Sequence, residues 1–247
     1  MACKANLSEQ INFMDPIDKL IKNINYQFKN KDLLLEACTH KSYIAEQKST
    51  VPDNQRLEYL GDAVIQIIVT TYLYEKYPEY TEGKLTKLRA TITRQESLVE
   101  FANAIELGPC LRLGKGEFIS DGQNRPSNLC DIFEALIGAI YLDQEHSLEV
   151  STKLLYELIE KHIDDVEKRL QNDNPKGTLQ EWVQEKYQGK PLYKTLSITG
   201  PDHKRQYTVA VMVDGKEKGQ GVASKLRTAE QNAAREAIQN LIEAGEF

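Results

Sequence analysis

The sequence predicts two domains, an all-helical domain followed by a smaller α+β domain with the order α-β-β-β-α. Three observations predict this fold class. Apolar residues recur every three or four positions along most of the chain, as in amphipathic helices. A polar cluster, EKRLQNDNPKG at 167–177, ends that pattern. Beyond the cluster, short alternating segments indicate strands between two helices.

The spacing of apolar residues predicts the helices of the first domain. They are expected at 17–24, 32–37, 57–74, 84–93, 95–104, 131–142 and 148–163. The segment GKGEFISDGQNRPSN at 114–128 is polar and rich in glycine, so we expect a loop there. The polar cluster places the first domain at 1–170, a linker at 171–174 and the second domain at 175–247.

The second domain differs from the first in its pattern of apolar residues. TLQEWVQEKY at 178–187 predicts a helix, and 224–244 predicts an amphipathic helix rich in alanine. Between them, strands are expected at 193–200, 205–215 and 216–223. The dipeptide Asp214-Gly215 is a strong hairpin signal between the last two strands.

The composition limits the classes of protein. The formal net charge is −6, but residues 175–247 carry 11 Lys and Arg against 9 Asp and Glu, so the excess of acid lies before them. This asymmetry suggests two domains with different tasks. No apolar stretch of about 18 residues predicts a membrane span, and the first residues lack the apolar core of an export signal. Four cysteines without a CxxC motif indicate reduced thiols in the cytoplasm rather than zinc ligands.

Two predicted helices carry acids inside apolar runs. RLEYLGDAV places Glu58 and Asp62 four residues apart, so both project from one face. CDIFEALIGAIYLD places Asp131 and Glu134 three residues apart on the second helix. Each pair alone also fits a solvated helix face or an ordinary ion pair. The candidate bases for such pairs are Arg56, Lys84 and Arg89.

Four carboxylates would meet if these two helices packed face to face. Gly61 leaves room beside the first pair, and Gly138 would let the second helix pack closely. Because unpaired buried carboxylates are costly, the cluster would require cations. Oxygen ligands suit Mg²⁺ or Mn²⁺. A divalent ion held in this way is an apparatus for phosphodiester hydrolysis.

Several motifs resemble those of the bacterial ribonuclease III family, in the family's order and spacing. They are THKSY (39–43), RLEYLGDAV (56–64), EGKLTKLRATI (82–92), LGKGE (113–117) and FEALIGAIYLD (133–143). The second domain resembles a double-stranded RNA-binding domain through LQEWVQ, GPDHKRQYTV and AEQNAAREA. The resemblance spans nearly the whole chain.

The resemblance implies a ribonuclease III nuclease domain that forms a homodimer, with one metal site in each protomer. It implies hydrolysis of double-stranded RNA with Mg²⁺, or Mn²⁺ as a substitute, leaving 5′-phosphate and 3′-hydroxyl ends. The implied role is processing of rRNA and mRNA precursors in the cytoplasm. Asp62 and Glu134 are expected to matter most for catalysis. The implied metal ligands are Glu58, Asp62, Asp131 and Glu134.

The resemblance also implies how the second domain binds RNA. Side chains of the first helix and of a loop reach two minor grooves, and a basic helix start contacts phosphates between them. The implied residues are Gln180, Glu181, Gln184, His203, Lys225 and Arg227. Glu181 suits a 2′-hydroxyl, which can donate a hydrogen bond to a carboxylate.

The sequence departs from the family pattern at three positions. Gln55 stands where the family often has Glu, Gly177 where it has Thr or Ser, and Leu226 where it commonly has a base. Two rival functions remain open at this point. One is a duplex-RNA-binding protein that does not cleave, and the other is a helical metal phosphohydrolase acting on small nucleotides.

Overall fold

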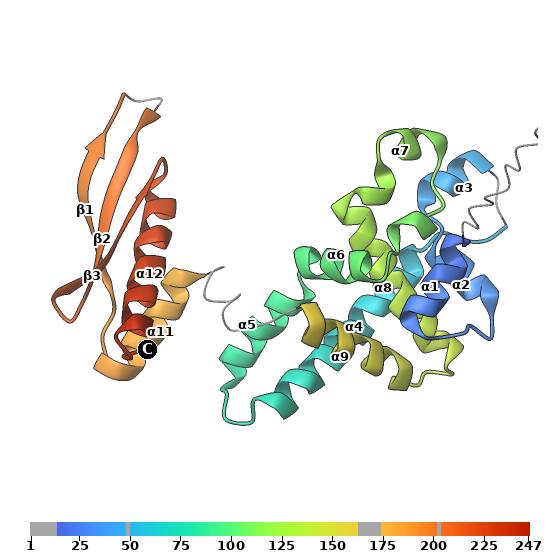
Figure 1. Ribbon diagram of the computed structural model, residues 1–247, viewed down its shortest axis with the longest axis horizontal. Coiled ribbons are helices and arrows are strands. Elements are labelled where there is room, and N and C mark those ends of the chain that lie inside the picture. The colour runs from blue at the N-terminus through green and yellow to red at the C-terminus, as the bar shows by residue number, and fades with distance from the viewer. Residues whose placement is uncertain (1–13, 48–49, 163–173, 202–203) are drawn as a thin grey trace, which may run out of the picture. The chain divides into compact units, whose positions relative to one another are not determined.

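The chain divides into two compact units, residues 1–164 and 165–247. The computed structural model describes residues 14–47, 50–162, 174–201 and 204–247 (Figure 1). A helical unit is followed by a unit of order α-β-β-β-α, so the predicted fold class is confirmed. The predicted linker at 171–174 lies outside the described residues except for Asn174, and the boundaries 1–170 and 175–247 stay predictions.

The described part of the first unit is helical. Its α-helices are α1 (Pro16–Ile24), α2 (Lys31–Ala37), α3 (Lys41–Gln47), α4 (Gln55–Lys76), α5 (Glu82–Thr93), α6 (Gln95–Ala104), α7 (Lys115–Ile119), α8 (Pro126–Asp143) and α9 (Glu149–His162). Short 3₁₀ turns η1 (Gly108–Cys110) and η2 (Gly122–Asn124) join them. The prediction of a loop over 114–128 is wrong in part, because α7, η2 and the first turn of α8 lie there.

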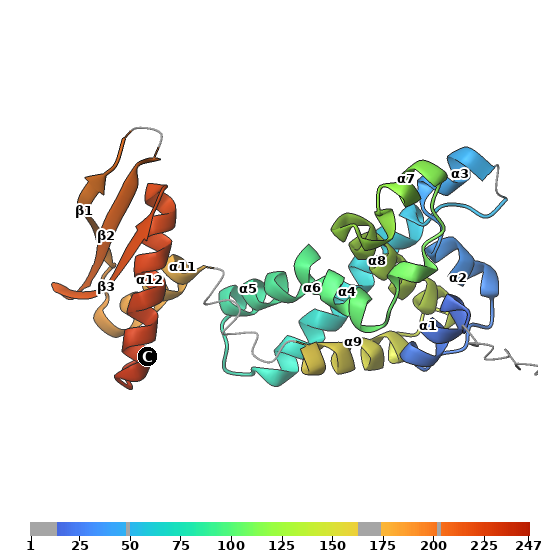
Figure 2. The same cartoon turned by 45° about the horizontal axis from the view of Figure 1, so that its top comes forward.

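Helix α8 runs through the middle of this unit, with α4 beside it (Figures 1 and 2). It is apolar on nearly every side because α2, α4, α6 and α9 all pack against it. Helix α4 buries Val64 and Ile65, whereas Ile67 is half exposed. A helix of 22 residues is covered on part of its circumference, and Ile67 lies on the uncovered part.

Asp143 fixes the end of α8 to the segment before α2. Its two carboxylate oxygens accept the backbone N–H groups of Lys29 and Asn30, each at 2.8 Å. The Tyr26 hydroxyl donates to the same carboxylate. Asp143 is buried, with 6% of its surface exposed, and these donors satisfy it. The position of α8 along its axis is therefore set at its C-terminal end.

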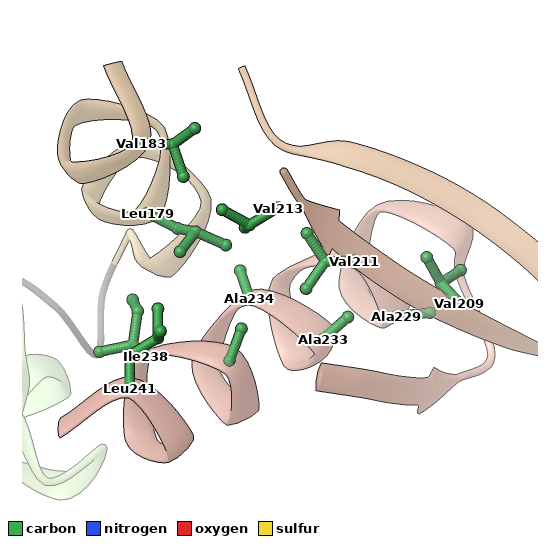
Figure 3. Packing of buried hydrophobic residues seen from close by; sticks show 11 residues of the cluster. Leu179, Val183, Val209, Val211, Val213, Ala229, Ala233, Ala234, Ile238 and Leu241 are labelled. Carbon is green, nitrogen blue, oxygen red and sulfur yellow. The ribbon is translucent and has the colours of Figure 1, made fainter. Parts of the chain in front are cut away.

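The second unit packs two helices against one face of a three-stranded sheet. Its elements are α11 (Pro175–Tyr187), β1 (Leu192–Thr199), β2 (Gln206–Val213), β3 (Lys216–Ala223) and α12 (Leu226–Glu243). The strands are antiparallel in the order β1-β2-β3. Leu179 and Val183 of α11 meet the valines of β2 and the alanine face of α12 in the core (Figure 3). The predicted turn at Asp214-Gly215 is confirmed, with φ of 48° and 73°.

Helix α12 follows the outer edge of β3. Asn232 Nδ2 donates to the carbonyl of Val222 at 3.0 Å, and Asn240 Nδ2 donates to that of Lys218 at 2.8 Å. Between them, the Glu236 carboxylate accepts the backbone N–H of Gln220. The three side chains recur every four residues, so they form one stripe along α12. They satisfy backbone groups that β2, on the other side of β3, cannot reach.

Candidate functional site

The site begins where α4 and α8 touch backbone to backbone. A Cβ atom on Gly61 would lie 1.8 Å from the carbonyl oxygen of Glu134. A Cβ atom on Gly138 would lie 2.4 Å from the carbonyl oxygen of Leu57. Both positions therefore require glycine, and the structure meets the expectation that Gly138 lets the second helix pack closely. The two helices are therefore in closest contact along the segments that carry the four acids.

The two acidic pairs lie more than sixty residues apart in the sequence, and in the structure they come together in one cluster. Ligand atoms of Cys130, Asp131 and Glu134 lie within 4.8 Å of one another. Glu58 and Asp62 from α4 are not in that group of three, but their charges act on Glu134 across the helix contact. Asp62 is exposed and accepts a hydrogen bond from Gln66 Nε2 at 3.4 Å, while the other three acids are partly buried.

Electrostatic strain in the cluster is concentrated on Glu134. Burial and the charges of the other three acids raise the pKa of Glu134 to about 8. Burial and the charge of Asp131 likewise raise the pKa of Glu58, against the lowering effect of Lys41. Burial raises the pKa of Asp131, although His40 and Lys41 act in the opposite direction. The repulsion among carboxylates held this close is relieved by protonation of one of them or by a cation.

The bases that could have neutralised these acids lie elsewhere. Arg89 donates to Thr70 Oγ1 at 3.1 Å, and Lys84 Nζ lies 3.4 Å from the centre of the Tyr80 ring. The charge of Arg56 acts on Glu36. Within the part of the chain that the structure describes, no ion pair engages any of the four acids. Among the described residues, the structure therefore gives no support to ordinary salt bridges of these acids with Arg56, Lys84 or Arg89.

A second layer, formed by the start of α3 and by α7, supports the rim of the cluster. The Ser42 hydroxyl lies 2.8 Å from His40 Nδ1 and accepts the backbone N–H of Gly114 at 2.9 Å. Glu46 accepts the backbone N–H of Lys115 at 2.7 Å. These contacts fasten α7 to α3. The charges of His40 and Lys41, at the start of α3, both reach Asp131.

Glu117 of α7 ties this layer to the start of α8. Its carboxylate accepts Asn128 Nδ2 at 2.9 Å and forms an ion pair with Arg125. The hydrogen bond from Asn128 is the largest cause of the lowered pKa of Glu117. The sequence alone indicates no role for Glu117 of the LGKGE motif, and it does not identify Cys130 and Lys41 as neighbours of the acids. Adjacency to Asp131 was the one available signal for Cys130.

The donor set fits a hard divalent cation. Carboxylate oxygens from two helices are the ligands that Mg²⁺ and Mn²⁺ prefer, and several remaining positions can be filled by water. A positive charge among the acids would stabilise the ionised carboxylate of Glu134 and so lower its raised pKa. Cys130 contributes a thiol whose pKa burial raises to about 12, so it remains protonated at neutral pH.

The second unit presents its candidate RNA contacts on two helices. Gln180, Glu181 and Gln184 are exposed on α11, and Lys225 and Arg227 are exposed at the start of α12. Lys176 joins the two helix starts, since its Nζ lies 2.6 Å from Glu230 Oε2 and its backbone N–H donates to Gln231. His203 lies outside the described residues. Helix α12 begins at Leu226, two residues later than the sequence predicted.

The structure shows the surroundings of the three residues that depart from the family pattern. Gly177 lies under the N-cap residue Asn174, which accepts its backbone N–H at 3.3 Å. A Cβ atom on Gly177 would lie 2.3 Å from Asn174 Nδ2, so the cap and the glycine fit each other. Leu226 is 42% exposed at the start of α12. Gln55 is exposed at the start of α4, where the acids begin.

Fold and site together define a class of protein, a helical nuclease domain joined to a domain that binds duplex RNA. The sequence model described as ribonuclease-III-like matches residues 30–161, and that of the double-stranded RNA binding motif matches residues 175–241. The chain belongs to the ribonuclease III family.

Named relatives cover almost the whole chain. Ribonuclease 3 of Geobacillus thermodenitrificans is 42% identical over 224 residues, 90% of each chain. Ribonuclease 3 of Listeria monocytogenes is 41% identical over 230 residues, 93% of this chain and 99% of the relative. The nuclease domain of ribonuclease III from Campylobacter jejuni has a TM-score of 0.55 and 38% identity, covering 62% of this chain and 99% of that structure.

The protein is a double-stranded-RNA-specific endoribonuclease, and processing of RNA precursors is the general role of its family. The family is generally metal-dependent. The second unit binds double-stranded RNA. Among the described residues, no helix combines the length and apolar character needed to cross a bilayer.

Proposed function

We propose that Mg²⁺, with Mn²⁺ as a substitute, binds among the four acids of α4 and α8. The observation that carries this proposal is the convergence of the acids: ligand atoms of Asp131 and Glu134 lie within 4.8 Å of one another. Burial and three neighbouring carboxylates place electrostatic strain on Glu134, whose pKa is raised to about 8. A cation of high charge and preference for oxygen relieves that strain. Asp62 and Glu134 are the pair whose loss should damage the chemistry most. The proposed ligands are Glu58, Asp62, Asp131 and Glu134.

The residues of the chain then have distinct tasks in hydrolysis. When bound, the cation lowers the pKa of a water molecule and stabilises charge on the phosphate. Glu134 and Asp131 hold the deeper side of the site, and exposed Asp62 faces the solvent from which substrate and water arrive. Lys41 places a positive charge at the rim near Glu58 and Asp131. The products are 5′-phosphate and 3′-hydroxyl ends.

A homodimer through the nuclease domain is part of the proposal. One side of α4 exposes large apolar residues, with Tyr59 84%, Ile67 50% and Tyr74 71% exposed. These three positions lie within about 80° of one another around a helix of 100° per residue. An apolar stripe of this size suits burial against a second copy. A Campylobacter jejuni structure concerns a region involved in dimer formation of this nuclease domain. Two sites would then cut opposite strands.

The second domain is proposed to read two successive minor grooves of the duplex. Gln180, Glu181 and Gln184 serve one groove, and His203 serves the next. Lys225 and Arg227 contact the phosphates between them, where the free N–H groups of the start of α12 add to the attraction. We keep the boundaries 1–170, 171–174 and 175–247 for the domains and linker. The substrates proposed are rRNA and mRNA precursors in the cytoplasm.

Incubation of the purified chain with a long RNA duplex and Mg²⁺ tests this function. Short duplex products with 5′-phosphate ends are expected, and none should form in EDTA. Binding without cleavage would instead favour the duplex-RNA-binding protein. Hydrolysis of small nucleotides that survives removal of residues 175–247 would favour the phosphohydrolase.

A further inference from the structure

The last three residues of the sequence, 245–247, fold back onto α11; they are called the tail below. Helix α12 ends at Glu243, and Gly245 adopts a φ of +67°, which turns the chain sharply. The backbone N–H of Glu246 then donates to the carbonyl of Leu241 at 2.9 Å. The direction of the tail is therefore built into the end of α12.

The tail contacts α11 through one ring and one charge. Phe247 stacks on Trp182, with ring centres 5.6 Å apart and planes inclined by 20°. Lys186 Nζ donates to the backbone carbonyl of Glu246 at 3.1 Å and lies 4.7 Å from the centre of the Trp182 ring. The Glu246 carboxylate also forms an ion pair with Lys218 of β3 at 3.3 Å. The tail thus joins α11 to the sheet.

Helix α11 has few other attachments at this end. Its buried residues are Pro175, Leu179 and Val183, all in its first nine positions. At its start, Lys176 is bound to Glu230 of α12. The last turn before Tyr187 has no fully buried side chain. Val183 and Trp182 pack against the core, and the contacts of the tail add a fastening for the last turn of α11, beyond Val183.

The tail lies on a different side of α11 from the proposed RNA contacts. At 100° per residue, Gln180, Glu181 and Gln184 occupy one side of the helix. Trp182 and Lys186, four residues apart, project from the other side. Removal of the tail consequently takes away no proposed RNA contact. An effect of the tail on RNA binding has to act through the position of α11.

We propose that the tail positions the RNA-reading helix α11, with Phe247 on Trp182 and Glu246 bridging Lys186 and Lys218 as its positioning contacts. The inference rests on the proposed role of α11 in reading duplex RNA. A helix whose last turn is also fastened meets the duplex with its side chains already placed, and a helix whose last turn is not fastened must have that turn ordered on binding.

The chain offers a direct probe, because Trp182 is its single tryptophan. The variants are Phe247→Ala, Phe247→Tyr as the conservative change, and Glu246→Gln. Glu243→Gln is the matched control, since Glu243 accepts a hydrogen bond from Gln239 on exposed α12. The full chain is used throughout, and tryptophan emission and the Kd for a labelled RNA duplex are measured in EDTA. The duplex has about 20 base pairs, more than the span of about 16 that one such domain covers.

Phe247→Ala should shift the Trp182 emission to longer wavelength and raise the Kd roughly three- to tenfold, the cost of ordering one or two side chains. In Mg²⁺, KM should rise with kcat unchanged, whereas a general folding defect would lower kcat as well. Phe247→Tyr should restore both readouts, and Glu246→Gln should weaken binding while Glu243→Gln does not.

The proposal is overturned if the wild type binds and Phe247→Ala binds within about twofold of it, a difference below the ordering cost of one side chain. Unchanged Trp182 emission in Phe247→Ala would overturn it as well. A wild-type chain that neither binds nor cleaves the duplex would refute the proposed function itself, and the tail proposal with it.

Discussion

Gly61 of α4 lies directly against the main chain of Glu134 in α8, with room for hydrogen but not for a methyl group. Glu134, the acid under the greatest electrostatic strain, therefore has its position because Gly61 on the opposite helix has no side chain. Since backbone atoms define this contact, rotamer changes cannot relieve it. The geometry of the cluster depends on the helix crossing as much as on the acids.

Gly61→Ala should separate α4 from α8. A Cβ atom 1.8 Å from a carbonyl oxygen forces the backbone to move, and overpacking of this kind costs about 1–3 kcal/mol or more. We expect a lower Tm and a large loss of cleavage. Gly83→Ala is the control, because nothing lies within 4 Å of its added Cβ, and it should be neutral or stabilising by about 0.4–1 kcal/mol. A fully active, fully stable Gly61→Ala chain would contradict the crossing described here.

Glu134→Gln should abolish cleavage and leave duplex RNA binding measurable. The amide keeps the shape of the side chain but removes the charge that attracts the cation, so the rate should fall at least about a hundredfold. Cleavage of a synthetic hairpin and binding of the same RNA in EDTA are the two measurements. Glu79→Gln, at an exposed loop acid, should change neither. Joint loss of binding and cleavage in Glu134→Gln would count against the division of tasks between the domains.

The response of stability to Mg²⁺ should depend on pH. In the metal-free protein the pKa of Glu134 is raised from 4.5 to about 8, and those of Glu58 and Asp131 are raised as well. The folded state therefore binds protons more tightly than the unfolded state, so metal-free stability should fall as pH rises between these values. The cation competes with these protons. Addition of Mg²⁺ should raise the Tm more near pH 8 than near pH 5.5, and an equal rise at both would exclude these acids as the main ligands.

Asp143 should control stability in acid. Burial alone would raise the pKa of its carboxyl, but the hydrogen bonds from Tyr26, Asn30 and Lys29 lower it overall. A lowered pKa means that the contribution to stability is present above the ordinary value of 3.8 and is lost as pH falls through the folded pKa.

Asp143→Asn should therefore cost about 1–3 kcal/mol at neutral pH, because an amide cannot accept all three donors as a carboxylate does. The slope of stability below about pH 4 should also become flatter. Thermal unfolding across the acid range measures both effects. Asp18→Asn, at an exposed acid of α1, should stay within about 0.5 kcal/mol of the wild type. An unchanged acid profile in Asp143→Asn would show that another group governs it.

Lys225→Ala should weaken duplex binding and reduce its salt dependence. A lysine that neutralises one phosphate releases about one counterion, so the slope of log K against log salt should decrease by about 1. Lys216→Ala is the matched control, because Lys216 begins β3, at the opposite end of that strand from the start of α12. Equal effects of the two substitutions would argue for diffuse attraction rather than contact at the start of α12.

The sequence predicts the long elements well and the short ones poorly. Helices α4 and α8 have 22 and 18 residues, enough for the apolar spacing to be unambiguous. Helix α7 has 5 residues, fewer than two turns, and no periodicity can be read over it. Its position depends on hydrogen bonds to Ser42 and Glu46, which lie about seventy residues earlier.

The acids of the candidate site are visible in the sequence, but their meeting is not. The spacing of Glu58 and Asp62 predicts a shared face on one helix, and nothing in that spacing selects the helix opposite. The structure adds the contact at Gly61 and Gly138, the neighbouring thiol of Cys130 and the charge of Lys41. Each of these depends on distances between segments far apart in the chain.

The stripe of Asn232, Glu236 and Asn240 also affects how the protein aggregates at high local concentration. A strand with unused backbone groups at the rim of a sheet is a template on which another polypeptide can add and fibrils can grow. Here those groups on β3 are already engaged by α12. Many copies can therefore gather on one long duplex, or in a concentrated solution, without their sheets fusing through this side.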